Sequence, residues 1–189
     1  MIGLILVSLV VLLILWGIIT FNQLVSLRNH VKNAWQQIDV QLKRRHDLIP
    51  NLVSTVKGAL EFEKGTLESV ISARAKAVSA GSTHEKAVAE NVLTQALGRL
   101  FAVVENYPDL KSNRNIMQLQ EELTTTENRI GFARQLYNDL VANYSIKQET
   151  FPNSIVVSIA GGAFRKEEYF KAENADREVP GVDISIRSK

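Results

Sequence analysis

Residues 34–53 read AWQQIDVQLKRRHDLIPNLV, and this stretch decides the fold. Apolar side chains recur in it at gaps of three and four, a spacing typical of a helix that buries one stripe against its neighbours. Arg45 lies in the same phase as Leu42 and Ile49, so a charged residue is predicted on the buried face. Pro50 cannot donate an intrahelical hydrogen bond, and we expect a kink at this position.

The same spacing extends along the chain on both sides of this stretch. It begins at Leu24, continues through Leu27 and Val31, and reaches Val56 and Ala59 without a break in phase. We therefore predict one helix that runs from the N-terminal segment past Pro50 to about Ala80. Its stripe is expected to pack within a single bundle in preference to an intermolecular coiled coil.

The N-terminal segment is long and apolar enough to cross a bilayer. Residues 2–21 contain no charged side chain, and the first one is Arg28. At about 1.5 Å per residue, such a helix spans a hydrocarbon core of about 30 Å. A basic segment and a small-residue cleavage site, which a signal peptide needs, are both missing. The sequence predicts a retained transmembrane helix over residues 1–21, with the lipid bilayer as its partner.

Basic residues lie only on the C-terminal side of this segment. Arg28, Lys32 and the run Lys43, Arg44 and Arg45 follow it, and none precedes it. Under the positive-inside rule this flank lies in the cytoplasm. We expect a single-pass protein of the cell inner (cytoplasmic) membrane, with the N-terminus outside and the C-terminal domain cytoplasmic.

The rest of the chain is predicted to be helical as well. The turn SAGSTHE precedes a helix over 83–106, for which Ser82 or Thr83 can cap the start. A second regular stripe runs from Ile116 to Tyr144, and FPN at 151–153 ends that helix. AFRKEEYFKAE at 163–173 is predicted as a short amphipathic helix before a tail. The fold class is all-α: a transmembrane helix (1–21), a cytoplasmic long-helix bundle (22–150), and a C-terminal short helix and tail (151–189).

Several long strings resemble one family. AWQQIDVQLKRRHDLIPNLV, LESVISARAKAV, ENYPDLKSN, LQEELTTTENRIGFARQLYNDLVANY and FPNSIV together are similar to the LemA family, in order over about residues 21–170. The resemblance implies one membrane helix and a cytoplasmic antiparallel bundle of about four helices. It implies no agreed biochemical activity. Its association with membrane metalloproteases in gene neighbourhoods makes such an enzyme one candidate partner. Phe21 stands where the family tends to have tyrosine, and the usual aromatic after Gly58 is missing.

Composition and spacing argue against catalysis and against bound cofactors. The chain has no cysteine, so thiolate catalysis, disulfides and the usual structural zinc sites are excluded. Its three histidines lack metal-ligand spacing, and the net charge of +2 suggests no nucleic-acid partner. An active site would have to recruit seven polar residues, namely Arg45, His46, Asp47, Glu105, Asp109, Glu127 and Arg129. Adjacent residues of one helix point in different directions. We expect no enzyme, no metal, no cofactor and no nucleic acid.

The polar motif is instead expected to serve the bundle. Arg45 on a buried stripe needs an acidic partner, for which Glu127 is the first choice and Glu105 the second. Asp47 is expected to hydrogen-bond backbone groups near Pro50 as part of this structural polar network. Lys43 and Arg44 lie off the stripe and are predicted to face a protein partner or anionic lipid headgroups.

These observations favour a non-catalytic, membrane-anchored helical scaffold or adaptor that presents its cytoplasmic bundle to protein partners, including copies of itself. Two alternatives stay open. The chain could form a self-assembling, membrane-associated lattice that shapes or supports the membrane. It could also be an accessory subunit that modulates a membrane metalloprotease.

Overall fold

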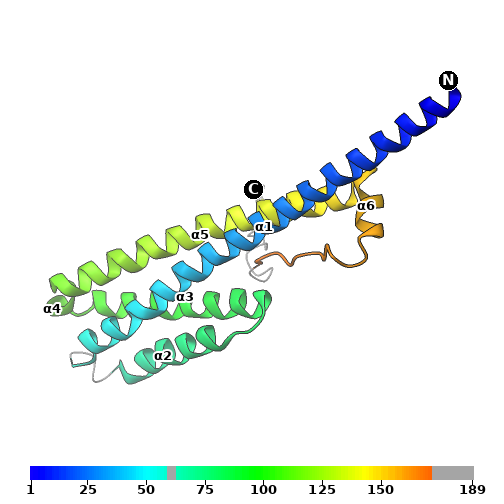
Figure 1. The fold of residues 1–189 in the computed structure, drawn as a ribbon. Helices are drawn as coiled ribbons and strands as arrows, with labels where there is room; N and C mark the ends of the chain where they lie inside the picture. The colour runs from blue at the N-terminus through cyan, green and yellow to red at the C-terminus, as the bar shows by residue number, and fades with distance from the viewer. Residues whose placement is uncertain (59–62, 172–189) are drawn as a thin grey trace, which may run out of the picture.

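The computed structural model describes residues 1–58 and 63–171, and every regular element in this part of the chain is a helix (Figure 1). The elements are α1 (Ile2–Lys57), α2 (Lys64–Ser79), α3 (Thr83–Glu105), α4 (Pro108–Lys111), α5 (Arg114–Glu149) and α6 (Asn153–Ile159). The predicted all-α class, with long helices in an antiparallel bundle, is confirmed.

The bundle consists of two helix pairs. α5 runs antiparallel to α1 over most of its length, and α2 forms a hairpin with α3 beside the distal part of α1 (Figure 1). The hairpin turn is fixed by a capping box, in which the Ser82 side chain accepts from the Glu85 backbone and the Glu85 carboxylate accepts from Ser82. The predicted start of this helix is thus confirmed.

Two hydrophobic clusters fill the bundle. The distal cluster joins α1, α2, α3, α4 and α5, and it includes Ile49, Leu52, Val70, Leu97 and Leu123. The proximal cluster lies nearer the N-terminus and joins α1 mainly to α5, with Leu24, Ile38, Ile130, Tyr137 and Tyr144. The heptad stripes predicted on α1 and α5 therefore face each other within one bundle.

The predicted extent of the first helix is wrong at its C-terminal end. α1 continues unbroken through Pro50 but ends at Lys57, and α2 starts anew at Lys64. Ala59 lies outside the described residues. Leu67 and Val70 continue the apolar spacing because α2 has a buried stripe of its own. Residue spacing alone cannot predict that the chain reverses its direction between the two helices. Glycines at 58 and 65 weaken the helix on either side of the break.

The N-terminal part of α1 extends away from the bundle (Figure 1). Its first buried residue is Thr20, and the apolar side chains before it are exposed except for the half-buried Trp16. By length and composition this part of α1 could span a membrane once. α3 also passes that test, but it packs inside the bundle and carries a buried glutamate.

The predicted amphipathic helix at 163–173 is wrong. Residues 163–171 contain no helix, and residues 172 and 173 lie outside the described part. The preceding turn uses positive φ angles at Gly161 and Gly162, which glycine adopts readily. Beyond it, Phe164 and Phe170 are buried against the α1/α5 pair. The Asn138 side chain donates to the carbonyl of Phe170 and accepts from its N–H, so tertiary contacts hold this backbone extended.

Candidate functional site

A layer of polar side chains separates the two hydrophobic clusters. We call it the polar layer and define it as Arg45 and His46 of α1, Glu90 and Thr94 of α3, and Glu127 of α5. Leu42 of the proximal cluster and Ile49 of the distal cluster lie on either side of it along α1. The layer therefore occurs where the α1/α5 pair meets the α2/α3 pair.

Arg45 is the centre of the polar layer. Only 2% of the residue is exposed, as its position in the heptad stripe predicts. Its Nη1 lies 2.6 Å from Oε2 of Glu127 and 3.4 Å from Oε2 of Glu90. Its Nη2 donates to the Thr94 hydroxyl at 2.8 Å. One guanidinium thus joins three helices, which suits its planar array of donors.

Glu90 is the acidic residue that the sequence reasoning missed. It is fully buried, and its Oε1 lies 2.6 Å from Nε2 of His46 while Oε2 faces Arg45. Adjacent residues of α1 therefore contact the two oxygens of one carboxylate. A signal was present in the sequence, because Glu90 lies three residues after Ala87 and three before Leu93, both of which are buried.

Of the two acidic partners predicted for Arg45, one contacts it and the other does not. The structure brings Glu127, the first choice, into contact with Arg45. Glu105 lies at the exposed C-terminal end of α3 and makes no ion pair with Arg45, so the second choice is wrong. Arg45 is instead satisfied by Glu90, which lies nearer the N-terminus of α3. Asp109 is exposed in α4, and Arg129 is exposed on α5.

The backbone hydrogen bond predicted for Asp47 near Pro50 is made by Arg74. Pro50 has no N–H to donate to the carbonyl of His46, four residues earlier. Nε of Arg74, from α2, donates to that carbonyl at 2.7 Å. Asp47 is exposed, and no hydrogen bond joins its side chain to the described backbone. A cation from a neighbouring helix therefore satisfies the group that the proline leaves free.

This arrangement predicts an energetic coupling between Arg74 and Pro50. Arg74→Met is expected to lower the free energy of unfolding by about 1.5–3 kcal/mol, the usual range for a hydrogen bond with a charged partner. In a Pro50→Ala background the loss should be smaller, because the substituted alanine has a backbone N–H that can donate to the His46 carbonyl within the helix. Denaturant unfolding of the four variants in a double-mutant cycle measures the coupling.

The matched control is Lys76→Met, an exposed cation on the same helix, for which little change is expected in either background. Equal losses for Arg74→Met with and without Pro50 would show that Arg74 does not replace the missing backbone donor.

Lys43 and Arg44 lie outside the polar layer. Both are exposed, and Arg44 makes only a loose ion pair with Glu122 at 3.8 Å. A surface ion pair of this kind contributes little stability. Their predicted role in contacting a protein partner or lipid headgroups stays a prediction.

Arg134 of α5 is a second cation close to the layer. Its guanidinium stacks over the Phe170 ring at 4.7 Å, a cation–π contact. Burial lowers the pKa of Arg134, whereas the nearby carboxylates of Glu127 and Glu90 act to raise it. Arg134 therefore adds a second cation beside the two carboxylates of the layer, so opposite charges lie close together there.

The carboxylates of the polar layer are engaged with side chains of other helices. Both oxygens of Glu90 contact α1 side chains, and Glu127 contacts Arg45, so each carboxylate is already engaged. Over residues 1–58 and 63–171, no three histidine, aspartate or glutamate side chains gather as metal ligands. The layer thus links side chains of α1, α3 and α5.

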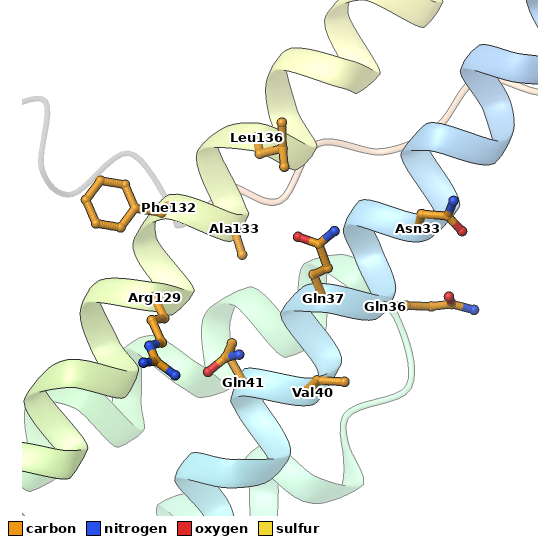
Figure 2. Close-up of a pocket in the computed structure, with 9 residues that line it drawn as sticks. All are labelled: Asn33, Gln36, Gln37, Val40, Gln41, Arg129, Phe132, Ala133 and Leu136. Atoms are coloured by element: carbon orange, nitrogen blue, oxygen red, sulfur yellow. The ribbon is translucent and has the colours of Figure 1, made fainter.

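A separate feature is an open groove between α1 and α5 (Figure 2). Its volume is about 700 Å³, and Gln37 and Gln41 point from α1 towards α5 within it. We call it the glutamine groove, with lining residues Asn33, Gln36, Gln37, Val40, Gln41, Arg129, Phe132, Ala133 and Leu136. Val40 and Phe132 on its borders are 62% and 73% exposed.

A family model described as the LemA family matches residues 34–184, well over half of the chain. The chain belongs to the LemA family. The matched range contains the whole polar layer and nearly all of the glutamine groove, and it begins after the apolar N-terminal part of α1.

This LemA-family chain is similar to three further proteins. It is similar to magnetosome protein MamQ 2 of Paramagnetospirillum magneticum, with 26% identity over 82% of this chain and 66% of the relative. Magnetosome protein MamQ of Magnetospirillum gryphiswaldense is 24% identical over the same shares. Protein LemA of Metamycoplasma hominis is 26% identical over 69% of this chain and 60% of its own. The chain thus spans between 60% and 66% of the length of these relatives.

Proposed function

We propose that this LemA-family protein is a non-catalytic, membrane-anchored scaffold that presents a rigid helical bundle to protein partners in the cytoplasm. The observation that carries the proposal is the continuity of α1. One helix includes the exposed apolar segment and then supplies Leu24, Ile38 and Leu52 to both hydrophobic clusters. A membrane anchor joined in this way holds the bundle at a fixed distance from the bilayer.

The interior of the bundle supports the non-catalytic part of the proposal. General acid–base catalysis needs groups that reach a substrate from a pocket. His46 and Glu90 are instead in contact with each other between helices. The exposed surface is left for recognition, and Lys43 and Arg44 lie on it.

The orientation of the anchor gives the first test. A reporter fused after Lys189 is expected to face the cytoplasm, because Arg28 and Lys32 follow the apolar segment and no basic side chain precedes it. The measurement compares reporters that are active only inside or only outside the cell. A control chain with several lysines added before Ile2 and with Arg28 and Lys32 replaced by glutamine should favour the opposite orientation. An external C-terminus in the natural chain would refute the cytoplasmic scaffold.

A self-assembling lattice at the membrane is the second candidate, and the glutamine groove favours it. Val40 and Phe132 are large exposed apolar groups beside a row of amides, which is a suitable surface for a helix of a second copy. If the groove joins copies, Phe132→Asp should reduce the size of the particle extracted in mild detergent. Ile71→Asp, at an exposed apolar position on α2, is the matched control and should leave the size unchanged.

Light scattering and electron microscopy of the extracted particles measure the effect. A natural chain that is monomeric in detergent and in lipid nanodiscs would exclude the lattice and favour the adaptor.

A further inference from the structure

The short helix α6 lies beside the last turns of the apolar segment of α1 and crosses it at a steep angle (Figure 1). An apolar groove runs between them, lined by Ile14, Gly17, Ile18, Phe21, Val156, Ile159 and Ala160. Phe21 also packs edge-on against Phe164, with ring centroids 5.2 Å apart. Side-chain contacts therefore place α6 at the level of the part of α1 that is closest to the bundle.

The outer face of this region is apolar and uncovered. Residues 151–164 contain no charged side chain. Phe151 and Ile159 are 77% and 81% exposed, and Ile155 is exposed as well. Ile159 lines the groove together with Ile14 and Ile18, so the exposed apolar surface continues from α6 onto α1. We call Phe151, Ile155 and Ile159 the α6 patch.

The inner face of the same helix holds it in place. Asn153 is buried, and Val157 packs against the proximal hydrophobic cluster. After α6, the Arg28 guanidinium donates to the carbonyl of Ala163 at 3.0 Å. Arg28 is also the first charged side chain of the chain, so the water-facing side begins at this level. The patch is thus displayed by a segment that is fixed on the bundle.

From this geometry we infer that the α6 patch is a second membrane contact, in which α6 lies in the interface of the bilayer that α1 crosses. The inference rests on the proposed membrane anchor. A helix that crosses a transmembrane helix steeply lies close to the bilayer plane, and apolar side chains on its outer face then enter the headgroup and acyl boundary. Lipid suits this patch better than a second copy because the patch is continuous with the surface that the anchor presents to lipid.

Two fixed contacts define the rotation of the bundle about α1, whereas a single helix leaves that rotation free. The side of the bundle that carries α6 is held towards the bilayer. The glutamine groove and the Lys43 and Arg44 surface then keep a fixed direction relative to the membrane.

Fluorescent labels at single cysteines test the contact, because the natural chain contains no cysteine. Ile159→Cys, Leu9→Cys and Ile71→Cys are each labelled with an environment-sensitive dye in the full chain, reconstituted in vesicles of phosphatidylcholine and phosphatidylglycerol. Leu9 reports on the anchor, and Ile71 is an exposed apolar position on the distal helix α2. Quenching is measured with aqueous iodide and with lipids spin-labelled near the headgroup.

We expect the Ile159 label to show iodide quenching several-fold weaker than the Ile71 label and strong quenching by the spin-labelled lipid. Equal iodide quenching at Ile159 and Ile71, with Leu9 protected, would overturn the α6 contact and leave the anchor intact. A Leu9 label open to iodide would refute the anchor and, with it, this inference. An Ile159 label shielded from both quenchers would show that protein, such as a second copy, covers the patch, and would also overturn the inference.

Discussion

Arg45→Ala is expected to lower the free energy of unfolding by about 3–5 kcal/mol, because it leaves buried charge without its partner. The fully buried Glu90 would keep its contact with His46 of α1 but lose the guanidinium, which also contacts Glu127 of α5. Thr94 would lose its donor as well. Thermal and denaturant unfolding of a soluble chain that begins near Thr20, followed by circular dichroism, measures the loss.

Lys43→Ala and Arg44→Ala are the matched controls. They remove neighbouring cations of the same helix that are exposed, so changes within about 0.5 kcal/mol are expected. Joint replacement by apolar residues, Arg45→Met with Glu90→Leu, should recover much of the stability lost in Arg45→Ala, because no charge is then left buried at Glu90. If Arg45→Ala is as stable as the natural chain but a partner no longer binds, QLKRRHDLIPNLV is a recognition surface.

Removal of residues 1–19 is expected to release the chain from the membrane. On the membrane-insertion scale each large apolar residue near the bilayer centre contributes about 0.3–0.6 kcal/mol, so this segment supplies an anchoring free energy of several kcal/mol. The shortened chain keeps Thr20, the first buried residue, and Phe21, which contacts Phe164. Carbonate washing of membranes, followed by detection of both chains in pellet and supernatant, measures the change.

The bundle itself should tolerate this deletion. The removed side chains are largely exposed, so the shortened chain should keep its helical circular dichroism spectrum and a cooperative unfolding transition. A control with Leu9→Asp and Leu12→Asp in the full chain should weaken anchoring without shortening it, because charges near the bilayer centre are costly. A shortened chain that resists carbonate extraction would show that the main anchor lies elsewhere.

The sequence predicts burial well where one helix face is long and regular. The phase of Leu42 and Ile49 was enough to place Arg45 inside the bundle, and Glu127 was found because it follows the stripe residue Thr126. Glu90 was missed because an acidic residue on a helix is expected to face solvent until its neighbours in the fold are known. Its burial depends on Arg45 and His46, two residues of another helix.

Connections and tertiary contacts were the parts that spacing could not predict. Leu67 and Val70 fit one continued helix as well as a helix that folds back, because both bury the same stripe. Residues 163–171 have a helical pattern of charges, yet burial of Phe164 and Phe170 and the Asn138 hydrogen bonds favour an extended backbone. Arg74 could not be linked to the His46 carbonyl because the two residues lie on different helices.

Because α1 is unbroken, a tilt of its N-terminal segment displaces the far end of the helix. From Asn22 to Lys57 the helix has 36 residues and, at about 1.5 Å per residue, extends about 54 Å beyond the apolar segment. Transmembrane helices tilt by about 20° on average and change tilt with bilayer thickness. A tilt of that size moves the far end of α1 sideways by about 18 Å, with α2 and α3 attached to it. Where α1 spans the bilayer as proposed, a change of membrane thickness that alters its tilt displaces the distal helices relative to neighbouring molecules.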